Sequence, residues 1–200
     1  MPRGLRPTLT ERRAGELRTA IALTAMEIFV ADGDTSATIE RICDAAGVSQ
    51  RTFHRHFPAK EDVVRPLFRA SSDEVIATLR EARDDGGDPV ETLVQAWLSL
   101  LDDSKLNAYE RRFLTLMITT PEYHLRWMET DDELCEAVAR FLHRGTTAGE
   151  HPVRRMLPAY LIVQATRYIF EHWITSGSDD DIADLLRQAF RMVLSGAHVR

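Results

Sequence analysis

The stretch TIERICDAAGVSQRTFHRHFPAK, residues 38–60, sets the organisation of the whole chain. Thr38 is suited to cap a short helix, because its hydroxyl can accept a backbone N–H that the first turn leaves unpaired. Gly47 stands where a left-handed residue commonly ends a helix. Ser49 can cap a second helix, QRTFHRHF, which Pro58 stops. A short helix, a turn with Gly and a second short helix predict a helix-turn-helix.

The second helix of this motif carries side chains suited to DNA recognition. Phe53 and Phe57 anchor it, and its outward face has no acidic residue. In such a motif the N-terminal residues of the second helix meet base edges in the major groove. Arg can bond guanine and Gln adenine, whereas hydroxyls, His and Lys can hold phosphates. The predicted DNA-binding residues are Thr38, Ser49, Gln50, Arg51, Thr52, His54, Arg55 and Lys60.

A helical hairpin with a merely solvated polar face is the alternative to a DNA-binding motif. A helix–Gly–helix pattern taken alone would favour that alternative. The two caps, Gly47, the two aromatic anchors and the outward face without acidic residues occur together here. Their coincidence favours DNA binding.

The run AGVSQRTFHRHFPAKEDVV, residues 46–64, resembles the DNA-binding domain of the TetR family of transcriptional repressors. It follows that family's pattern AGVS-x-x-T-Φ-Y-x-HF-x-[SN]-KE-x-LL nearly from end to end. His54 stands where the family usually has Tyr, which commonly touches a phosphate. Ala59 replaces the usual Ser or Asn and removes a side-chain cap from the next helix. The specific resemblance covers about residues 17–67, and the remaining two-thirds is similar only as a string of helices.

The charge distribution agrees with a DNA face on an otherwise acidic protein. The 200 residues carry a net charge of −6. Residues 1–60 hold nine Lys or Arg and seven Asp or Glu, a balance of +2, against sixteen and twenty-four in residues 61–200, a balance of −8. A basic-leaning N-terminal third favours local DNA binding. Arg3, Arg6 and Arg12 fall in a segment that we interpret as a solvated tail, with a DNA-reaching arm as the alternative.

Apolar residues recur at helical spacing along the rest of the chain. A helix over 13–32 is expected to cover the helix-turn-helix, which is too small to bury its own core. A helix from Glu61 to about Arg83 is expected to link the DNA-binding part to the C-terminal part. Further helices are predicted over 89–102, 105–119, 121–144, 152–176 and from Ser178, which caps the last helix, to Gly196.

The predicted fold is therefore all-α, with about nine helices. Residues 1–59 form a helix-turn-helix DNA-binding domain with an N-terminal arm, and residues 60–200 form an effector-binding and dimerisation domain. The 152–176 helix is apolar on more than one side, which indicates burial on more than one side. The resemblance implies a dimer formed as a four-helix bundle by the last two helices. The predicted dimer contacts are Phe170, Ile174, Leu186, Phe190 and Val193.

A set of large apolar residues is predicted to line a ligand pocket in the C-terminal domain. Each one alone is more typical of a plain core, but the resemblance implies an apolar effector held inside this bundle. Gln164 and Arg167 are the candidates to orient it, with solvent or the dimer partner as their alternative surroundings. The predicted ligand-binding residues are Trp97, Phe113, Met117, Trp127, Phe141, Tyr160 and Gln164.

Catalytic and metal-binding motifs are missing from the sequence. There is no HExxH, GxSxG, P-loop or Gly-rich dinucleotide turn, and Cys43 and Cys135 have no metal-ligand spacing. No enzyme activity, metal or cofactor is predicted. The most apolar stretch, 156–174, contains charged residues, so a cytoplasmic protein is expected.

The sequence therefore predicts a homodimeric repressor that binds a palindromic double-stranded DNA operator and is released by a small apolar effector. Two alternatives remain. One is a helix-turn-helix regulator without an effector, controlled by a partner protein or by oxidation of Cys43. The other is an all-α enzyme.

Overall fold

The structure is all-α, which confirms the predicted fold class. The computed structural model describes residues 8–82, 87–102, 105–144, 151–178 and 180–197. Within these ranges there are ten α-helices and one short 3-10 helix, η1 (Lys60–Val64). Arg3 and Arg6 of the predicted arm lie outside the described residues. The α-helices are α1 (Leu9–Asp32), α2 (Ile39–Ala46), α3 (Gln50–His56), α4 (Arg65–Glu81), α5 (Pro89–Leu98), α6 (Ala108–Thr119), α7 (Pro121–Met128), α8 (Asp131–Leu142), α9 (Pro152–Ser176) and α10 (Ile182–Ala197).

Helix α1 begins four residues earlier than predicted because of a capping box. The side chain of Thr8 accepts the backbone N–H of Glu11 at 3.2 Å, and the Glu11 carboxylate accepts the N–H of Thr8 at 2.7 Å. Gly33 ends the helix in the left-handed conformation, with φ 77°. The stretch that looked like a tail therefore contributes its last residues to α1.

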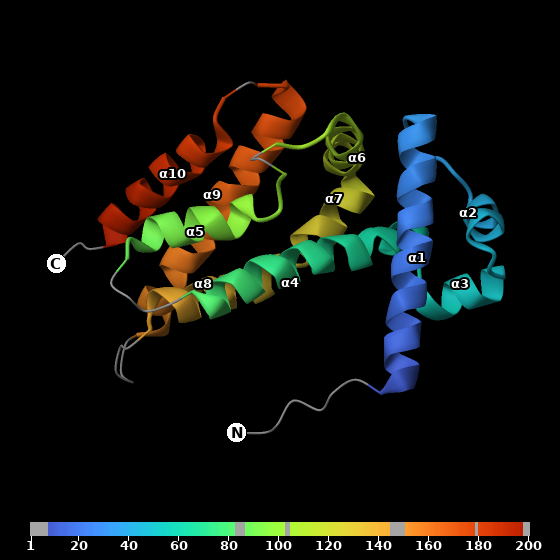
Figure 1. Ribbon diagram of the computed structural model, residues 1–200, viewed down its shortest axis with the longest axis horizontal. Coiled ribbons are helices and arrows are strands. Elements are labelled where there is room, and N and C mark those ends of the chain that lie inside the picture. Colours follow the sequence, from blue (N-terminus) through green and yellow to red (C-terminus); the bar gives the residue numbers. More distant parts are fainter. Residues whose placement is uncertain (1–7, 83–86, 103–104, 145–150, 179, 198–200) are drawn as a thin grey trace.

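Helices α2 and α3 form the predicted helix-turn-helix. Thr38 caps α2 by accepting the N–H of Arg41 at 3.2 Å, and Ser49 caps α3 by accepting the N–H of Thr52 at 3.1 Å. Gly47, with φ 66°, makes the turn between them. Both helices lie on the outer side of α1, at the end of the molecule away from α9 and α10 (Figure 1).

The core under the helix-turn-helix includes residues from the C-terminal part of the chain. Ile21, Phe29 and Phe53 are fully buried in it. Met117 of α6 and Tyr123 of α7 belong to the same cluster. The short N-terminal helices thus gain apolar partners from the body of the protein, as small domains need for stability.

Helix α4 connects the two ends of the molecule (Figure 1). The predicted helix start at Glu61 is instead the 3-10 turn η1, and the α-helix begins at Arg65 with Pro66 in its first turn. Phe68, near its start, is buried in the N-terminal core. Val75 and Leu79, further along, are buried in the C-terminal core.

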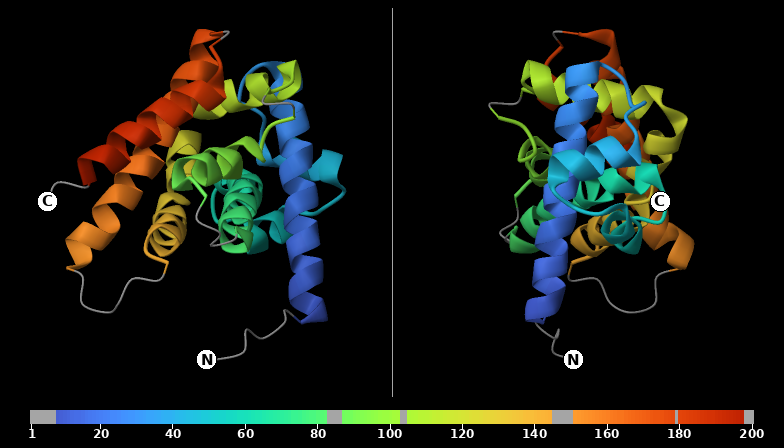
Figure 2. Two further views of the ribbon diagram at one scale, coloured as in Figure 1. Left: turned by 60° about the vertical axis from the view of Figure 1, so that its left-hand side comes forward. Right: turned by 90° about the vertical axis from the view of Figure 1, so that its right-hand side faces the viewer.

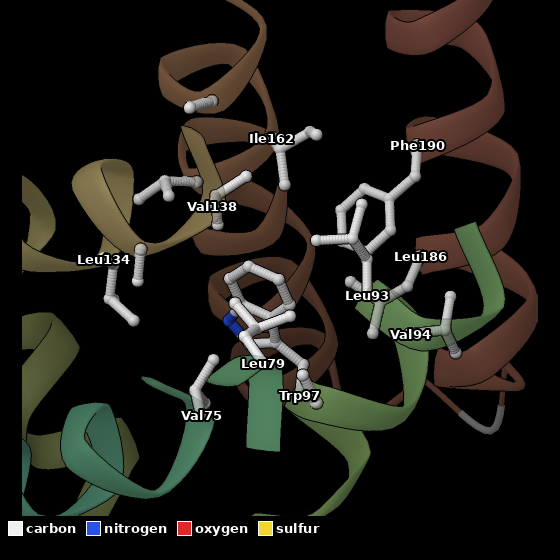
Figure 3. Packing of buried hydrophobic residues seen from close by; sticks show 14 of the residues in the cluster. Val75, Leu79, Leu93, Val94, Trp97, Leu134, Val138, Ile162, Leu186 and Phe190 are labelled. Carbon is white, nitrogen blue, oxygen red and sulfur yellow. The ribbon is translucent and has the colours of Figure 1, made fainter. Parts of the chain in front are cut away.

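The C-terminal core is built by α4, α5, α8, α9 and α10. Helices α9 and α10 pack against each other along their lengths (Figure 2). Leu186 and Phe190 of α10 point toward α5, where the ring of Trp97 lies 5.6 Å from that of Phe190 between centroids (Figure 3). Leu93 of α5 fills the space beside them.

Two further predicted boundaries are wrong. The segment 121–144 is two helices, because the acidic residues from Asp131 onward favour a new helix N-terminus, where the helix dipole stabilises negative charge. Ser178 does not cap the last helix. Asp181 accepts the N–H of Ala183 at 2.9 Å, and α10 then runs past Gly196.

Over the ranges that the structure covers, we find no helix with the length and apolar character needed to cross a membrane.

Phe190→Ala should destabilise the protein by about 3–5 kcal/mol, because it removes a fully buried ring and leaves a cavity between α5 and α10. Urea unfolding followed by circular dichroism measures this change. Gln188→Ala, on an exposed position of the same helix, is the matched control and should change stability by less than about 0.5 kcal/mol. Equal effects of the two substitutions would contradict the assigned core.

Candidate nucleic-acid interface and ligand cavity

Helix α3 presents a basic, polar face to solvent. Gln50, Arg51, His54 and Arg55 are exposed, whereas Phe53 is fully buried. Figure 2, right, views the molecule from the end where α2 and α3 lie in front of α1. An exposed helix with Gln and Arg in its first turn has the shape and donors for the major groove.

The predicted phosphate-binding residues lie around this helix. Thr38 and Ser49 are exposed caps, and Thr52 is half-buried, with its hydroxyl 3.0 Å from that of Ser49. Lys60 is also half-buried, and its ammonium donates to the backbone carbonyl of Thr35 at 2.8 Å. Lys60 therefore holds the loop between α1 and α2, and an ammonium has further N–H groups for a phosphate.

His56 faces the inside of the helix-turn-helix. Its Nε2 is buried and has no hydrogen-bond partner among the described residues. Burial, followed by the nearby charges of Arg55 and Arg18, lowers the pKa of His56. The ring is therefore kept neutral at neutral pH, and it serves packing rather than charge.

An ion-pair network that the sequence did not reveal joins the helix-turn-helix to the body. Asp62 of η1 is 4% exposed and lies 2.7 Å from Nε of Arg126 on α7. Its other oxygen accepts the N–H of Ala59 at 2.9 Å. Arg65 at the start of α4 lies 2.8 Å from Glu129, just after α7. These partners are some 64 residues apart, and pattern reading alone does not pair such distant charges.

A cavity of about 70 Å³ lies among α4, α5, α8 and α9. Two of the predicted ligand-binding residues, Trp97 and Trp127, line it. Its other walls come mainly from α4 and α9. They include Phe68, Ser72, Val75, Val163, Arg167 and Phe170.

The other predicted ligand-binding residues do not line this cavity. Phe113 and Met117 are buried in the N-terminal core, because that face of α6 packs toward α1. Phe141 lines a separate hollow of about 260 Å³ near the end of α8. Tyr160 is 43% exposed, and Gln164 is exposed but donates to Asp131 at 2.9 Å.

Arg167 forms a buried ion pair in the cavity wall. It is 9% exposed and donates from Nη2 to Asp131, the first residue of α8. Its guanidinium carbon lies 5.1 Å from the ring centroid of Trp127. Burial raises the pKa of Asp131, and Arg167 and Gln164 offset part of that rise.

Most of the predicted dimer contacts lie inside the chain's own core. Phe170, Ile174, Leu186 and Phe190 are all less than a tenth exposed, and Val193 is half-buried. Helical spacing predicts the apolar face of a helix, but it does not distinguish an intramolecular face from an intermolecular one. The exposed apolar residues of α9 and α10 are Val153, Leu157, Tyr160, Leu161, Tyr168 and Met192.

The described ranges contain no cluster of three or more His, Cys, Asp or Glu side chains placed to hold a metal ion. Cys43 and Cys135 are buried free thiols. Burial raises the pKa of Cys43 and raises that of Cys135 to about 12. Both are therefore protonated and unreactive at neutral pH.

Comparison with known proteins identifies the family. Residues 21–67 match bacterial regulatory proteins of the tetR family. This segment of the chain is of the tetR family. This confirms the resemblance seen in residues 46–64, and TetR-family members are DNA-binding transcriptional regulators with a helix-turn-helix.

Relatives of the chain over longer stretches are transcriptional regulators. The HTH-type transcriptional regulator TcmR of Streptomyces glaucescens is 29% identical over 143 residues, which are 68% of this chain and 63% of TcmR. The HTH-type transcriptional activator FasR of Mycolicibacterium smegmatis is 24% identical over 82% of this chain and 78% of its own. FadR of Thermus thermophilus, a TetR-family repressor solved with lauroyl-CoA, shares the fold. Its TM-score is 0.63, with 24% identity over 92% of this chain and 96% of FadR.

Asp62→Ala should destabilise the protein by about 1–3 kcal/mol, because Arg126 loses its buried partner and the N–H of Ala59 loses its acceptor, while Glu129 still pairs with Arg126 at 3.0 Å. Thermal or urea unfolding measures the change. Glu133→Ala is the matched control, since it removes an exposed pair between α4 and α8, in which Arg69 lies 2.5 Å from Glu133. That control should lose less than about 1 kcal/mol. A small loss for Asp62→Ala would show that the junction does not depend on this pair.

Proposed function

We propose that this TetR-family regulator is a homodimeric repressor of a palindromic operator, with a DNA-binding domain at 1–59 and an effector-binding and dimerisation domain at 60–200. The two α3 helices of the dimer would enter successive major-groove faces about 34–36 Å apart, or a multiple of that distance. The observation that carries the proposal is the outward placement of Gln50 and Arg51 at the start of α3, held there by buried Phe53.

The dimer follows from the size of one half-site contact. A single α3 reads only a few base pairs, and two linked copies gain affinity because the second binding event is intramolecular. The exposed apolar residues Leu157, Leu161 and Tyr168 of α9, with Met192 of α10, support self-association through these two helices. We therefore move the proposed dimer contacts to these residues.

Release by a small molecule is supported by the cavity beside α4. Phe68, Ser72 and Val75 of α4 form part of its wall, and η1 and α3 precede that helix in the chain. A ligand that prefers a shifted α4 would populate a conformation in which the two α3 helices no longer match the operator spacing. FadR, with the same fold, is a repressor that was solved with lauroyl-CoA.

The alternatives have less support. Control by oxidation of Cys43 requires an accessible thiolate, but this thiol is 1% exposed and burial raises its pKa. In the cavity wall, the hydroxyl of Ser72 donates to the carbonyl of Phe68 in its own helix rather than to a base, which does not suit a nucleophile. Activation rather than repression is the sign reported for the relative FasR, so the regulated promoter itself must be tested.

The deciding experiment measures binding of the full-length protein to the DNA flanking its own gene, by fluorescence anisotropy with competitor DNA. A repressor of a palindromic operator should protect a symmetric site, bind as a dimer and lower transcription from it. Binding of equal strength to random DNA would contradict the proposal.

Arg51→Ala and Gln50→Ala should change which operator bases are preferred. Each removes a bidentate base-edge donor worth about 1–3 kcal/mol of discrimination at one position. A selection from DNA with a randomised half-site measures the preference, and Arg69→Ala, at an exposed position of α4, is the control. Unchanged preference in both variants would place base reading elsewhere.

Lys60→Ala should weaken binding to all sequences alike and lower the salt slope of log K by about one unit. The physical reason is the loss of one phosphate contact at the start of η1. Binding measured over a series of salt concentrations tests it, and unfolding measured in parallel reports any loosening of the Thr35 loop. A change of base preference in this variant would show that Lys60 acts through the placement of α3 instead.

A further inference from the structure

We propose that the effector of this regulator is an apolar organic acid whose carboxylate is bound by Arg167. This inference rests on the proposed function, since it names the chemical class of the molecule that enters the cavity beside α4. The proposed ligand has a carboxylate head group, which Arg167 binds, and an apolar body, which the apolar wall of the cavity contacts.

The guanidinium of Arg167 has hydrogen-bond donors without an acceptor. Its Nη2 donates to Asp131, while Nε and Nη1 are buried and have no hydrogen-bond partner among the described residues. Buried donors are nearly always paired, because each unpaired one costs free energy. Arg167 is 9% exposed and lies in the cavity wall, and a ligand acceptor would reach its two covered nitrogens once the wall beside them opens.

Neighbouring polar groups in the wall are already occupied. The hydroxyl of Ser72 donates to the carbonyl of Phe68 at 3.1 Å, and that of Thr166 donates to the carbonyl of Ile162 at 2.9 Å. These hydroxyls satisfy their own helices. The strong donors that a ligand meets here are those of Arg167.

A carboxylate fits these donors better than a neutral oxygen does. Its charged oxygen can accept from either unpaired nitrogen, and hydrogen bonds between two charged groups are the stronger kind. The carboxylate of Asp131 is stabilised by other groups besides Arg167. Its second oxygen accepts from Gln164 at 2.9 Å, and it stands at the N-terminus of α8, where the helix dipole stabilises an anion.

The rest of the cavity selects an apolar body. Trp97, Trp127, Val163 and Phe170 supply most of that wall. The ring of Trp127 also lies against the guanidinium of Arg167, so an apolar group next to the carboxylate contacts this indole directly. A free volume of about 70 Å³ is smaller than the roughly 150 Å³ of a known cavity that binds benzene, so even a small apolar body must displace the walls.

The test compares acids with alcohols of the same skeleton on the full-length protein. Benzoate, 4-phenylbutanoate and octanoate are each titrated beside the corresponding alcohol, and calorimetry or tryptophan fluorescence, to which Trp97 and Trp127 contribute, reports binding. We expect each acid that binds to do so at least about tenfold more tightly than its alcohol. Arg167→Met should abolish that ratio while the alcohol still binds. Arg69→Met, which removes the same charge from an exposed position, should retain it.

Removal of Arg167 alone leaves the carboxylate of Asp131 without its cationic partner. If Arg167→Met does not fold, Asp131→Asn combined with Arg167→Met removes both charges and should show the same loss of acid preference. Equal affinity for acid and alcohol in the wild type, an acid preference that survives without Arg167, or no saturable binding of any acid would overturn the inference.

A parallel arm measures operator release by the same compounds and separates the two proposals. Release by an alcohol as effectively as by its acid would refute the role of Arg167 and leave effector control standing. Operator binding that none of these compounds alters, together with no binding to the cavity, would overturn the acid inference and remove the support for effector control.

Discussion

Helix α4 is packed into two hydrophobic cores at once, and the arrangement of both ends of the molecule depends on it. Phe68 is buried with the residues under the helix-turn-helix, and Leu79 is buried with α5, α8 and α10. Because folded cores are close-packed, a shift of one end of a rigid helix cannot be absorbed without a change at the other. The ion pair of Asp62 with Arg126 holds the start of this unit against α7. The placement of α3 is thus set by contacts that extend into the body.

Local signals in the sequence were sufficient for the helix-turn-helix. Thr38, Gly47 and Ser49 act within a few residues of their own positions, so caps and turn could be read directly from the chain. The same holds for the amphipathic spacing that buries Phe53. By contrast, Asp62 pairs with Arg126 across 64 positions, and helical periodicity does not reveal which charges meet.

The residues around the cavity were predicted only in part for the same reason. Trp97 and Trp127, two of the predicted ligand-binding residues, line it, but Phe113 and Met117 face the other core. Spacing identifies the apolar face of a helix, yet it does not say which neighbour covers that face. Phe190 shows this most clearly, since its apolar stripe was interpreted as a dimer surface and packs on Trp97 of the same chain. Arg167 stood out because a charge on an apolar helix must find a partner or a function.

The contact between Phe68 and Trp127 connects the cavity to the DNA-binding end. Their rings are stacked, with centroids 6.0 Å apart and planes 15° apart, and both line the cavity. Phe68 also stacks on Phe113 at 6.5 Å, inside the core that supports α1. A ligand larger than the present 70 Å³ must separate some of these walls. The carboxylate bound to Arg167 in the proposed complex would fix the ligand against α9 and Trp127. The wall left to move would then be Phe68 with the start of α4, which is the segment that leads directly into η1 and α3.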